Sequence, residues 1–282
     1  MSGIARFVWS HPIFRKGRLR AFARVAYWQV RSRLQEDVVV PWIGGQRLVV
    51  RRGMTGATGN IYAGLHEFAD MAFVLHFLRP DDLFFDIGAN VGSYTVLASG
   101  VCKARTWAFE PDPVTAAHLG RNIALNALQN CVTVHQIALG ATEADIPFTI
   151  GQDTVNKVAK TEDPNVRMVH QVPLDALAHE NVPSMIKMDV EGYEPEVIKG
   201  AARMLRDGRL KVIQSETVTA EMEQTLTQTG FERMQYDPFS RQLTPSDSVG
   251  TAASNILFVR DNVFTRKRLV SANKVTMFNV AF

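Results

Sequence analysis

A carboxylate that precedes a glycine-rich turn is the most informative feature of the sequence. Asp86 lies near the end of the apolar run Leu83–Ile87, and Gly88 and Gly92 then flank Asn90 as the chain turns toward a helix. In an open α/β sheet, ligands bind beyond the carboxyl ends of the strands, and glycines there let the backbone approach a ligand closely. We therefore expect these residues to bind a cofactor that carries a positive charge near Asp86.

A dinucleotide is the main alternative ligand for such a turn. The dinucleotide-binding pattern G-x-G-x-x-G would require glycine where this chain has Asn90 and Ser93. A pyrophosphate would also approach Asp86, where like charges repel. S-adenosylmethionine (AdoMet) has an ammonium group, a sulfonium and no phosphate. The turn therefore favours AdoMet, and an NAD-dependent oxidoreductase is the alternative.

A second acid, Glu110, follows the next expected strand, Thr106–Phe109. It comes about 20 residues after the glycine turn, where an acid can accept hydrogen bonds from both ribose hydroxyls of a nucleoside. Glu110 alone does not separate AdoMet from NAD, but Glu110 and Asp86 together favour AdoMet. The structural alternatives are that Asp86 only caps a helix and that Glu110 lies exposed on the surface.

A third acidic block occurs in Ile186–Tyr193, with the sequence IKMDVEGY. Period-two alternation in a strand puts Lys187, Asp189 and Glu191 on one side. Because the carboxyl end of this strand should face the same crevice as the two acids above, Asp189 is the first candidate for orienting the acceptor or taking its proton. The alternative is that these acids only begin a helix and contact solvent.

A base that removes the proton of a hydroxyl makes that hydroxyl a better nucleophile for methyl transfer. Three residues could supply this base: His66, Asp189 and His170. Asp189, Glu191 and Glu216 could also converge as oxygen ligands of Mg²⁺, although no spacing demands a metal and none is predicted. The catalytic candidates are Asp189, His66 and Glu191.

The elements that position these residues alternate between strand and helix after Pro80, which predicts an α/β fold with a mainly parallel sheet covered on both faces. Residues 141–175 interrupt the alternation, and Ile146–Ile150 with Arg167–Val172 predict an inserted hairpin. Phe231–Gln235 and Asn255–Val259 predict a closing antiparallel pair. The expected parallel strands are Leu83–Ile87, Thr106–Phe109, Val132–Ile137, Ile186–Val190 and Val212–Ser215, and the expected helices are Val91–Ser99, Pro113–Leu128 and Pro195–Leu205.

The segment before Pro80 has a different pattern. Val38–Trp42 and Gln46–Arg51 predict short strands around a Gly-Gly turn. Gly53–Asn60 is rich in Gly and Thr and predicts a loop, and a helix is expected from Leu65 to Leu78.

Composition indicates a globular protein of a reducing compartment. Hydrophobic residues make up 46% of the 282 residues and charged residues 21%. Two cysteines, Cys102 and Cys131, are too few for a disulfide framework or a four-cysteine zinc site. Nothing approaches the roughly 18 to 20 apolar residues of a membrane span, and the N-terminus lacks the apolar core of a secretory signal. A cytoplasmic protein is expected, with peripheral contact to the inner face of a membrane as an option.

The first 36 residues form a basic arm. They contain eight Lys or Arg and one acid, so they carry +7, and the rest of this +3 chain carries −4. From Lys16 to Leu34 the pattern predicts a helix whose apolar stripe is Leu19, Phe22, Ala23, Ala26, Tyr27 and Val30. Three interpretations stay open: a helix that packs its apolar side on the body or on a second subunit, an interfacial membrane helix, and, as the weakest, a nucleic-acid patch.

In these motifs the chain resembles the FkbM family of AdoMet-dependent methyltransferases. The matching text is FDIGANVGSYT at Phe85–Thr95, AFEPD at Ala108–Asp112, NIALN at Asn122–Asn126 and IKMDVEGY at Ile186–Tyr193. The resemblance implies a class I, Rossmann-like methyltransferase fold: a seven-stranded, mostly parallel sheet with one antiparallel strand and helices on both faces, here preceded by the basic helical arm.

The resemblance also implies a function. It implies transfer of a methyl group from AdoMet to a hydroxyl oxygen, commonly on a sugar or a secondary metabolite. Asp86, Gly88, Asn90 and Gly92 fall on the family's cofactor loop, and Glu110 falls on its ribose acid. Asp189, Glu191 and Gly192 fall on its DVEG block, and Asp189 is expected to contact the cofactor as well as the acceptor. Glu67, in YAGLHE, would border the cofactor. A non-catalytic AdoMet-binding module is a further alternative.

The expected organisation has four parts. Residues 1–45 form the basic arm, 46–80 the lead-in strands and helix, 81–262 the methyltransferase domain and 263–282 a C-terminal tail. The acceptor should be a small molecule or glycan with a hydroxyl. Its specificity is expected to lie in residues 141–175, the loop near Phe239–Gly250 and the arm.

Overall fold

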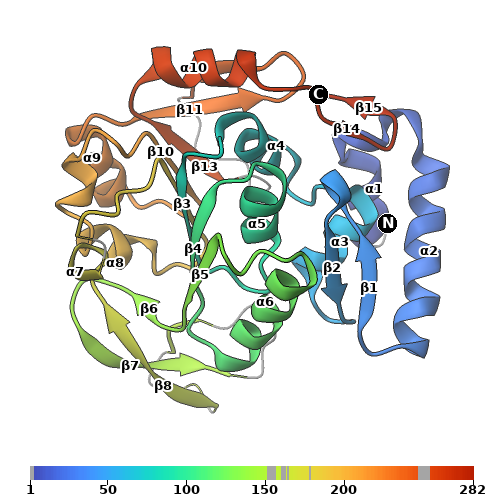
Figure 1. The fold of residues 1–282 in the computed structure, drawn as a ribbon, viewed down its shortest axis with the longest axis horizontal. Helices are drawn as coiled ribbons and strands as arrows, with labels where there is room; N and C mark the ends of the chain where they lie inside the picture. The colour runs from blue at the N-terminus through green and yellow to red at the C-terminus, as the bar shows by residue number, and fades with distance from the viewer. Residues whose placement is uncertain (1–2, 151–156, 160–162, 164, 178, 247–254) are drawn as a thin grey trace.

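The computed structural model describes residues 3–150, 157–159, 163, 165–177, 179–246 and 255–282 (Figure 1). Its centre is an eight-stranded sheet with the strand order β12-β11-β13-β10-β9-β3-β4-β5. These strands are β3 (Leu83–Ile87), β4 (Arg105–Phe109), β5 (Val132–His135), β9 (Met185–Met188), β10 (Val212–Ser215), β11 (Glu232–Asp237), β12 (Gln242–Pro245) and β13 (Ile256–Val259).

The sheet confirms the predicted class. Strands β5, β4, β3, β9 and β10 pair in parallel, and β13 is antiparallel to both β10 and β11. The predicted closing pair is therefore present. Strand β12, which was not predicted, pairs with β11 and adds an eighth strand at the edge. From β3 the chain adds β4 and β5 on one side of β3, and it later adds β9 on the other side. The strand order therefore reverses between β3 and β9. In such sheets, ligands bind at the carboxyl ends of the strands beside this reversal.

Helices cover both faces of the sheet, because successive buried side chains of a strand point to opposite sides. On β3, Phe84 belongs to the core on one face and Phe85 to the core on the other. The Phe84 face is covered by α4 (Phe68–Phe77), α6 (Pro113–Leu125) and α10 (Asn262–Ser271), and the Phe85 face by α8 (Glu194–Lys199) and α9 (Ala220–Gln228) (Figure 1).

One prediction of local structure was wrong, and another was right about a helix but not about its type or bounds. The predicted loop Gly53–Asn60 is mostly helix, because α3 (Thr55–Ala63) is supported by packing against α2 and β2, which outweighs its weak intrinsic propensity. The predicted helix Val91–Ser99 is a short α5 (Ser93–Thr95) followed by a π-helical segment, Val96–Val101.

The N-terminal segment packs along the side of the sheet that carries α6. It consists of α1 (Gly3–Ser10), a 3₁₀ turn (Pro12–Lys16), α2 (Arg18–Leu34) and the antiparallel hairpin of β1 (Val38–Pro41) and β2 (Arg47–Val50). The amide oxygens of Asn122 and Asn126 on α6 accept hydrogen bonds from the backbone of β2. The domain boundary expected at residue 45 therefore falls inside a hairpin that is joined to α6 by these hydrogen bonds.

The side of α2 that packs against the rest of the protein is not the predicted one. Its buried residues are Ala21, Trp28 and Ser32, whereas Leu19 and Val30 of the predicted apolar stripe are 86% and 61% exposed. Helix α3 and the β1–β2 hairpin lie on the inner side of α2, and no described element covers its outer side (Figure 1). The interpretation that the apolar stripe packs on the body of the same chain is thus wrong.

Two smaller sheets complete the fold. The insert forms β6 (Ala138–Leu139), β7 (Ala144–Thr149), β8 (Val166–Val172) and the short helix α7 (Leu174–Leu177), and the antiparallel pairing of β7 with β8 confirms the predicted hairpin. The expected C-terminal tail is ordered, because α10 packs on α4 and is followed by the hairpin of β14 (Thr276–Met277) and β15 (Val280–Ala281). Residues 247–254 of the expected specificity loop, and 151–156, 160–162 and 164 of the insert, lie outside the described residues.

Candidate active site

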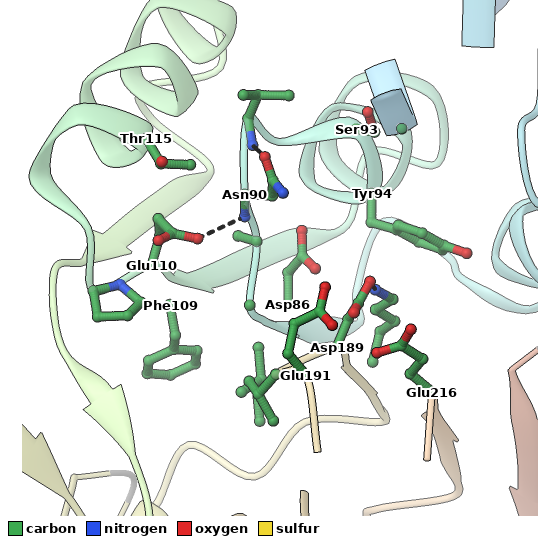
Figure 2. A pocket seen from close by; sticks show the side chains of 18 of the residues that line it. Asp86, Asn90, Ser93, Tyr94, Phe109, Glu110, Thr115, Asp189, Glu191 and Glu216 are labelled. Atoms are coloured by element: carbon green, nitrogen blue, oxygen red, sulfur yellow. Dashed lines mark hydrogen bonds and ion pairs between the residues drawn. The ribbon is translucent and has the colours of Figure 1, made fainter. Parts of the chain in front are cut away.

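A cavity of about 290 Å³ lies at the carboxyl ends of β3, β4 and β9, where the strand order reverses. Figure 2 shows Asp86, Asp189, Glu191 and Glu216 directed toward the same space, with Glu110 and Asn90 on one side and Tyr94 on the other. Of the residues predicted from the sequence, the cavity is lined by His66, Glu67, Asp86, Gly88, Asn90, Glu110, Asp189 and Glu191. The two remaining candidates, Gly92 and His170, are not among the residues that line it.

Asp86 is a buried carboxylate on β3 that is held by a residue of the helix after the glycine turn, α5. Its side chain is 1% exposed, and the Thr95 hydroxyl donates a 2.6 Å hydrogen bond to Asp86 Oδ2. Burial raises the pKa of Asp86 to about 6, although nearby Lys187 opposes this shift. A carboxylate in such a position favours a cationic ligand, because a cation restores the electrostatic stabilisation lost with water.

Glu110 is fixed by backbone groups on two sides. Its Oε2 accepts the amide N–H of Asn90 at 2.9 Å (Figure 2). Its Oε1 accepts that of Asp112 at 3.0 Å. These bonds hold the carboxylate at the wall of the cavity, and each oxygen keeps a lone pair for another donor such as a ribose hydroxyl. Burial raises the pKa of Glu110 to about 7, so a hydrogen-bond donor from a ligand would stabilise its ionised form.

The glycines of the turn act mainly through packing. Gly88 has φ +75°, and a Cβ there would lie 1.9 Å from the carbonyl oxygen of Asp189, so this glycine lets the ends of β3 and β9 approach. Gly92 has φ +91°, and a Cβ would lie 2.5 Å from Leu119 on α6. Gly92 therefore packs against α6, on the side of the turn that faces away from the cavity, which explains why it does not line the cavity.

Lys187 is a buried cation at the site. The sequence predicted its position on the side of Asp189 but no role for it. It is the direct neighbour of Asp86 on the adjacent strand, and its Nζ lies 2.6 Å from Asp189 Oδ2 and 4.7 Å from the centre of the Tyr94 ring. Burial alone would lower the pKa of Lys187, but the carboxylates of Asp189, Glu67 and Asp86 raise it. The predicted alternation fails after Lys187, because β9 ends at Met188 and Glu191 has φ +53°.

Asp189, Glu191 and Glu216 converge as the sequence suggested. Oxygen atoms of the three side chains lie within 4.8 Å of one another, a spacing that a divalent cation could bridge. Burial would raise the pKa of Asp189, but the charge and hydrogen bond of Lys187 lower it, whereas burial and Asp189 raise the pKa of Glu216 to about 8. The raised pKa of Glu216 favours a proton on this pair of carboxyl groups near neutral pH, which reduces the repulsion between them.

Glu67 belongs to a hydrogen-bonded network that the sequence did not predict. The Tyr94 hydroxyl donates to Glu67 Oε2 at 2.7 Å, and the Asn255 amide donates to Glu67 Oε1 at 3.4 Å. Asn255 also donates to Asp70 through both its side-chain and backbone nitrogens. Tyr94 lies within the glycine-turn motif and could have been inferred from it, but Asn255 is distant in sequence and carried no signal.

His66 lies between the cavity and the N-terminal segment. Its backbone N–H donates to Asn60 Oδ1 at 2.7 Å, and its ring packs against Phe7 with centroids 5.3 Å apart. Burial lowers the pKa of His66, so the ring is neutral at pH 7 and can accept a proton. His170, the other histidine candidate, lies on β8 and contacts Asp145 at 3.2 Å, away from the cavity.

A second, larger groove of about 1460 Å³ adjoins this cavity. It lies between the segment Phe7–Ile13, the start of α4, the turn between β11 and β12, and the hairpin of β14 and β15. Three residues line both the cavity and the groove: His66, Glu67 and Glu216. A ligand in one could therefore contact a ligand in the other at these three side chains.

Comparison with known proteins identifies the family of this fold and site. Residues 86–236 match the family model described as the methyltransferase FkbM domain, which covers more than half of the chain. The chain belongs to the FkbM family of methyltransferases. The family match includes Asp86, Glu110 and Asp189, and it ends within β11.

Individual relatives are distant. The chain is 28% identical over 139 residues to the hexuronic acid methyltransferase AglP of Haloferax volcanii, covering 48% of this chain and 56% of AglP. It is 30% identical over 149 residues to Methyltransferase 1 of Beauveria bassiana, covering 43% of this chain and 59% of that protein. The chain thus spans just over half the length of these two relatives. The solved FkbM methyltransferase of Methylobacillus flagellatus has 15% sequence identity and a TM-score of 0.46, covering 86% of this chain and 60% of that one.

The cavity of this FkbM methyltransferase fits the donor that its family implies. The carboxylates of Asp86 and Glu110 suit an ammonium group and a ribose, respectively. Lys187 is the one Lys or Arg among the described residues that line the cavity, and Asp189 already neutralises it. A phosphate-bearing nucleotide would therefore find no free cation among those residues.

Proposed function

We propose that this protein transfers a methyl group from AdoMet to a hydroxyl oxygen of a sugar or glycan. The observation that carries the proposal is the junction at His66, Glu67 and Glu216, where the acidic cavity opens into the larger groove. AdoMet, when bound, supplies an electrophilic methyl group on a positively charged sulfur. A donor in the cavity and an acceptor in the groove can meet only at this junction, so the three side chains there border the reacting atoms.

Two residues are assigned to binding the donor. Asp86 pairs with the ammonium group, and Glu110 accepts hydrogen bonds from the ribose hydroxyls. Both carboxylates are nearly fully buried and held by hydrogen bonds from Thr95 and from two backbone amides. Such groups need little rearrangement when a ligand arrives, which supports tight binding. Gly88 and Asn90 form the wall between these two carboxylates.

His66 is assigned the role of general base. It borders both the cavity and the groove, and burial keeps its ring neutral at pH 7. A neutral imidazole can take the proton of an acceptor hydroxyl as the oxygen attacks, a contribution that is typically worth about 10²- to 10⁴-fold in rate. Glu67 lies beside His66 and would stabilise the imidazolium that forms.

Asp189 is assigned to orientation, and not to proton transfer. Lys187 lowers its pKa, and an acid of low pKa is a weak base. Its fixed carboxylate can instead accept a hydrogen bond from an acceptor hydroxyl. Glu191 borders the cavity from the exposed side, and we assign it to contact with the acceptor.

The alternatives differ in what they predict. An NAD-dependent oxidoreductase disagrees with the family to which the chain belongs. A non-catalytic AdoMet-binding module would bind AdoMet without consuming it. The experiment is to incubate the protein with methyl-labelled AdoMet and a glycan extract and to identify labelled products by mass spectrometry. We expect a methyl ether on a sugar hydroxyl whose formation is lost in His66→Asn, and AdoMet binding without any labelled product would refute the proposal.

A further inference from the structure

The groove beside the cavity has an unusual balance of charge. Its described lining residues include four acids and no Lys or Arg; the acids are Glu67, Asp70, Glu216 and Asp237. The two histidines in the lining, His11 and His66, have pKa values that burial lowers, to about 4 for His11, so both are neutral at pH 7. A carboxylate that enters this groove would find no Lys or Arg to pair with among the described lining residues, and those groove acids that are ionised would repel it in a partly desolvated site.

The rest of the groove suits a sugar. Phe239 is 46% exposed and packs against Phe68 with ring centroids 5.2 Å apart, so an aromatic face is available to the apolar side of a sugar ring. Hydroxyl and amide groups of Ser10, Thr217 and Gln235 lie along the same groove and can exchange hydrogen bonds with sugar hydroxyls.

We propose that the acceptor is a sugar unit without a carboxylate, either uncharged or bearing an amino group. This inference rests on the proposed function and narrows its substrate class. It also separates this protein from its relative AglP, whose name specifies a hexuronic acid. The acids of the groove would accept hydrogen bonds from an uncharged sugar and would attract an ammonium group.

The test compares three small probes: methyl β-D-glucopyranoside, its 2-amino-2-deoxy analogue and methyl β-D-glucuronide. Binding of each to the full chain is measured by saturation-transfer NMR with S-adenosylhomocysteine present. We expect the first two to bind and the glucuronide to bind at least tenfold more weakly. Equal or tighter glucuronide binding, or binding of none of the three, would overturn the inference.

A matched pair of variants localises the effect. Gln235→Lys places a cation in the groove and should strengthen glucuronide binding about threefold or more, whereas Gln228→Lys, at the exposed end of α9, should leave it unchanged. Equal effects of both variants would mean that the probes do not occupy this groove. Formation of a labelled product from methyl-labelled AdoMet and a glycan extract tests the proposed function separately, because it does not depend on which of the three probes binds.

A second inference comes from the outer face of α2, which lies at the edge of the molecule (Figure 1). Leu19, Tyr27, Val30 and Leu34 on this face are between 61% and 86% exposed, and Phe22 lies among them. Their spacing of three, four and eight residues forms one continuous apolar stripe along a helix of 17 residues. Such a stripe is unfavourable in water unless something covers it.

Charged residues flank this stripe and limit what can cover it. Arg20 and Arg33 are exposed beside it, and Arg18 stacks on the exposed ring of Trp9 at 4.0 Å. The first acid in the chain is Glu36. If two copies of α2 packed face to face, arginines would meet arginines without an acid between them. An anionic lipid surface provides both the apolar phase and the opposite charge, and Trp and Tyr favour this boundary.

We infer that α2, together with Trp9, docks this protein on an anionic membrane surface. None of the described helices is long and apolar enough to cross a bilayer, so the helix would lie in the plane of the interface. The cations would add about 1 kcal/mol each at such a surface, and salt would weaken the attraction.

The test is co-sedimentation of the full chain with vesicles of phosphatidylcholine alone or mixed with phosphatidylglycerol. We expect binding to the mixed vesicles only, with at least a tenfold loss in the double variant Leu19→Glu/Val30→Glu. The control is Val263→Glu/Val270→Glu on α10, whose valines are 80% and 69% exposed and whose substitution should leave binding intact.

Three outcomes would overturn the inference. They are failure of the wild-type chain to bind the mixed vesicles, equal loss of binding in both double variants, and a dimer in analytical ultracentrifugation that disappears only in Leu19→Glu/Val30→Glu. The last outcome would show that a second copy covers the stripe.

Discussion

The ammonium group of Lys187 lies 2.6 Å from the carboxylate of Asp189, two residues further along the chain, where β9 ends at the cavity. Lys187 is the buried member of this pair, and its charge keeps the partly exposed Asp189 ionised and fixed in direction. The pair also accounts for the raised pKa of Glu216, because the charge of Asp189 disfavours a second ionised carboxylate beside it. The pair therefore sets the electrostatics of the site.

Lys187→Met should destabilise the fold, because it leaves the acids around Lys187 without a buried cation. Breaking a buried pair on one side typically costs about 3–5 kcal/mol. Urea unfolding measures the loss, with Lys211→Met as the control, since Lys211 pairs with the exposed Asp261. A loss in Lys187→Met no larger than in the control would contradict this view of the site.

Asp86→Asn should weaken AdoMet binding about 10- to 100-fold while the fold survives, because it removes the charge but keeps the shape of the side chain. The exposed residue Asp81, changed to Asn, provides the control. Isothermal titration calorimetry measures the affinity, and melting temperature checks the fold. Unchanged affinity in Asp86→Asn would remove this residue from the donor site.

His66→Asn should lower kcat by about 10²- to 10⁴-fold and leave the Kd for AdoMet within about twofold of wild type. The reason is that His66 is assigned to the acceptor's proton and not to the donor. A pH profile of kcat for the wild-type enzyme, measured at saturating AdoMet so that protonation of Asp86 and Glu110 does not limit donor binding, should fall at acidic pH, and His66→Asn should lose this dependence. Full turnover in the variant would exclude His66 as the base.

Stability should fall as pH rises from about 6.5 to 8. The pKa values of Asp70 and Glu110 are both raised to about 7 by burial, so the folded protein holds protons that the unfolded chain has already released, and this stabilising difference disappears as the two acids ionise. Below pH 6.5 the buried His11 and His76 oppose this trend, because their pKa values are lowered to about 4. Melting temperature against pH measures the slope.

The variant for this experiment is Asp70→Asn, which cannot titrate and still accepts hydrogen bonds from Asn255. In Asp70→Asn the fall in melting temperature between pH 6.5 and 8 should be a few degrees smaller than in the wild-type protein. The reason for this size is that about 1 kcal/mol corresponds to roughly 2–4 °C in a domain of this size. Stability that rises with pH over this window in the wild-type protein would contradict the account.

Gly88→Ala should be strongly destabilising, because the new Cβ would lie 1.9 Å from the carbonyl oxygen of Asp189 and the residue has φ +75°. We expect a loss of at least about 2 kcal/mol in the free energy of unfolding. Gly120→Ala is the control: it lies within α6, has open space for a Cβ and should gain about 0.5–1 kcal/mol. Equal effects would mean that the turn is less closely packed than described.

The position of the cavity could be predicted from the sequence, because an apolar run that stops at an acid indicates the end of a strand. Asp86, Glu110 and Asp189 each end or follow a parallel strand, and parallel strands bring such residues to one edge. The position of Lys187 beside Asp86 depends on strand order, which places β9 next to β3. Local pattern does not contain strand order, so the contact between Lys187 and the surroundings of Asp86 was not predictable, although the alternation already put Lys187 and Asp189 on one side.

The groove and the arm were harder to predict for related reasons. Asn255 joins Glu67 and Asp70 only because β13 inserts between β10 and β11, a contact across more than 180 residues. Helical periodicity correctly predicted α2 but gave the wrong buried side, since periodicity shows that an apolar stripe exists and not what covers it. Trp28 and Ala21, on the other side, supply the packing instead.

A crystal structure of the full chain with S-adenosylhomocysteine tests the central claim most directly. We predict that the amino group of the ligand contacts Asp86, that its ribose hydroxyls contact Glu110, and that its sulfur faces the junction formed by His66, Glu67 and Glu216. A ligand whose sulfur points away from this junction, or one bound outside the cavity with Asp86 untouched, would contradict the account.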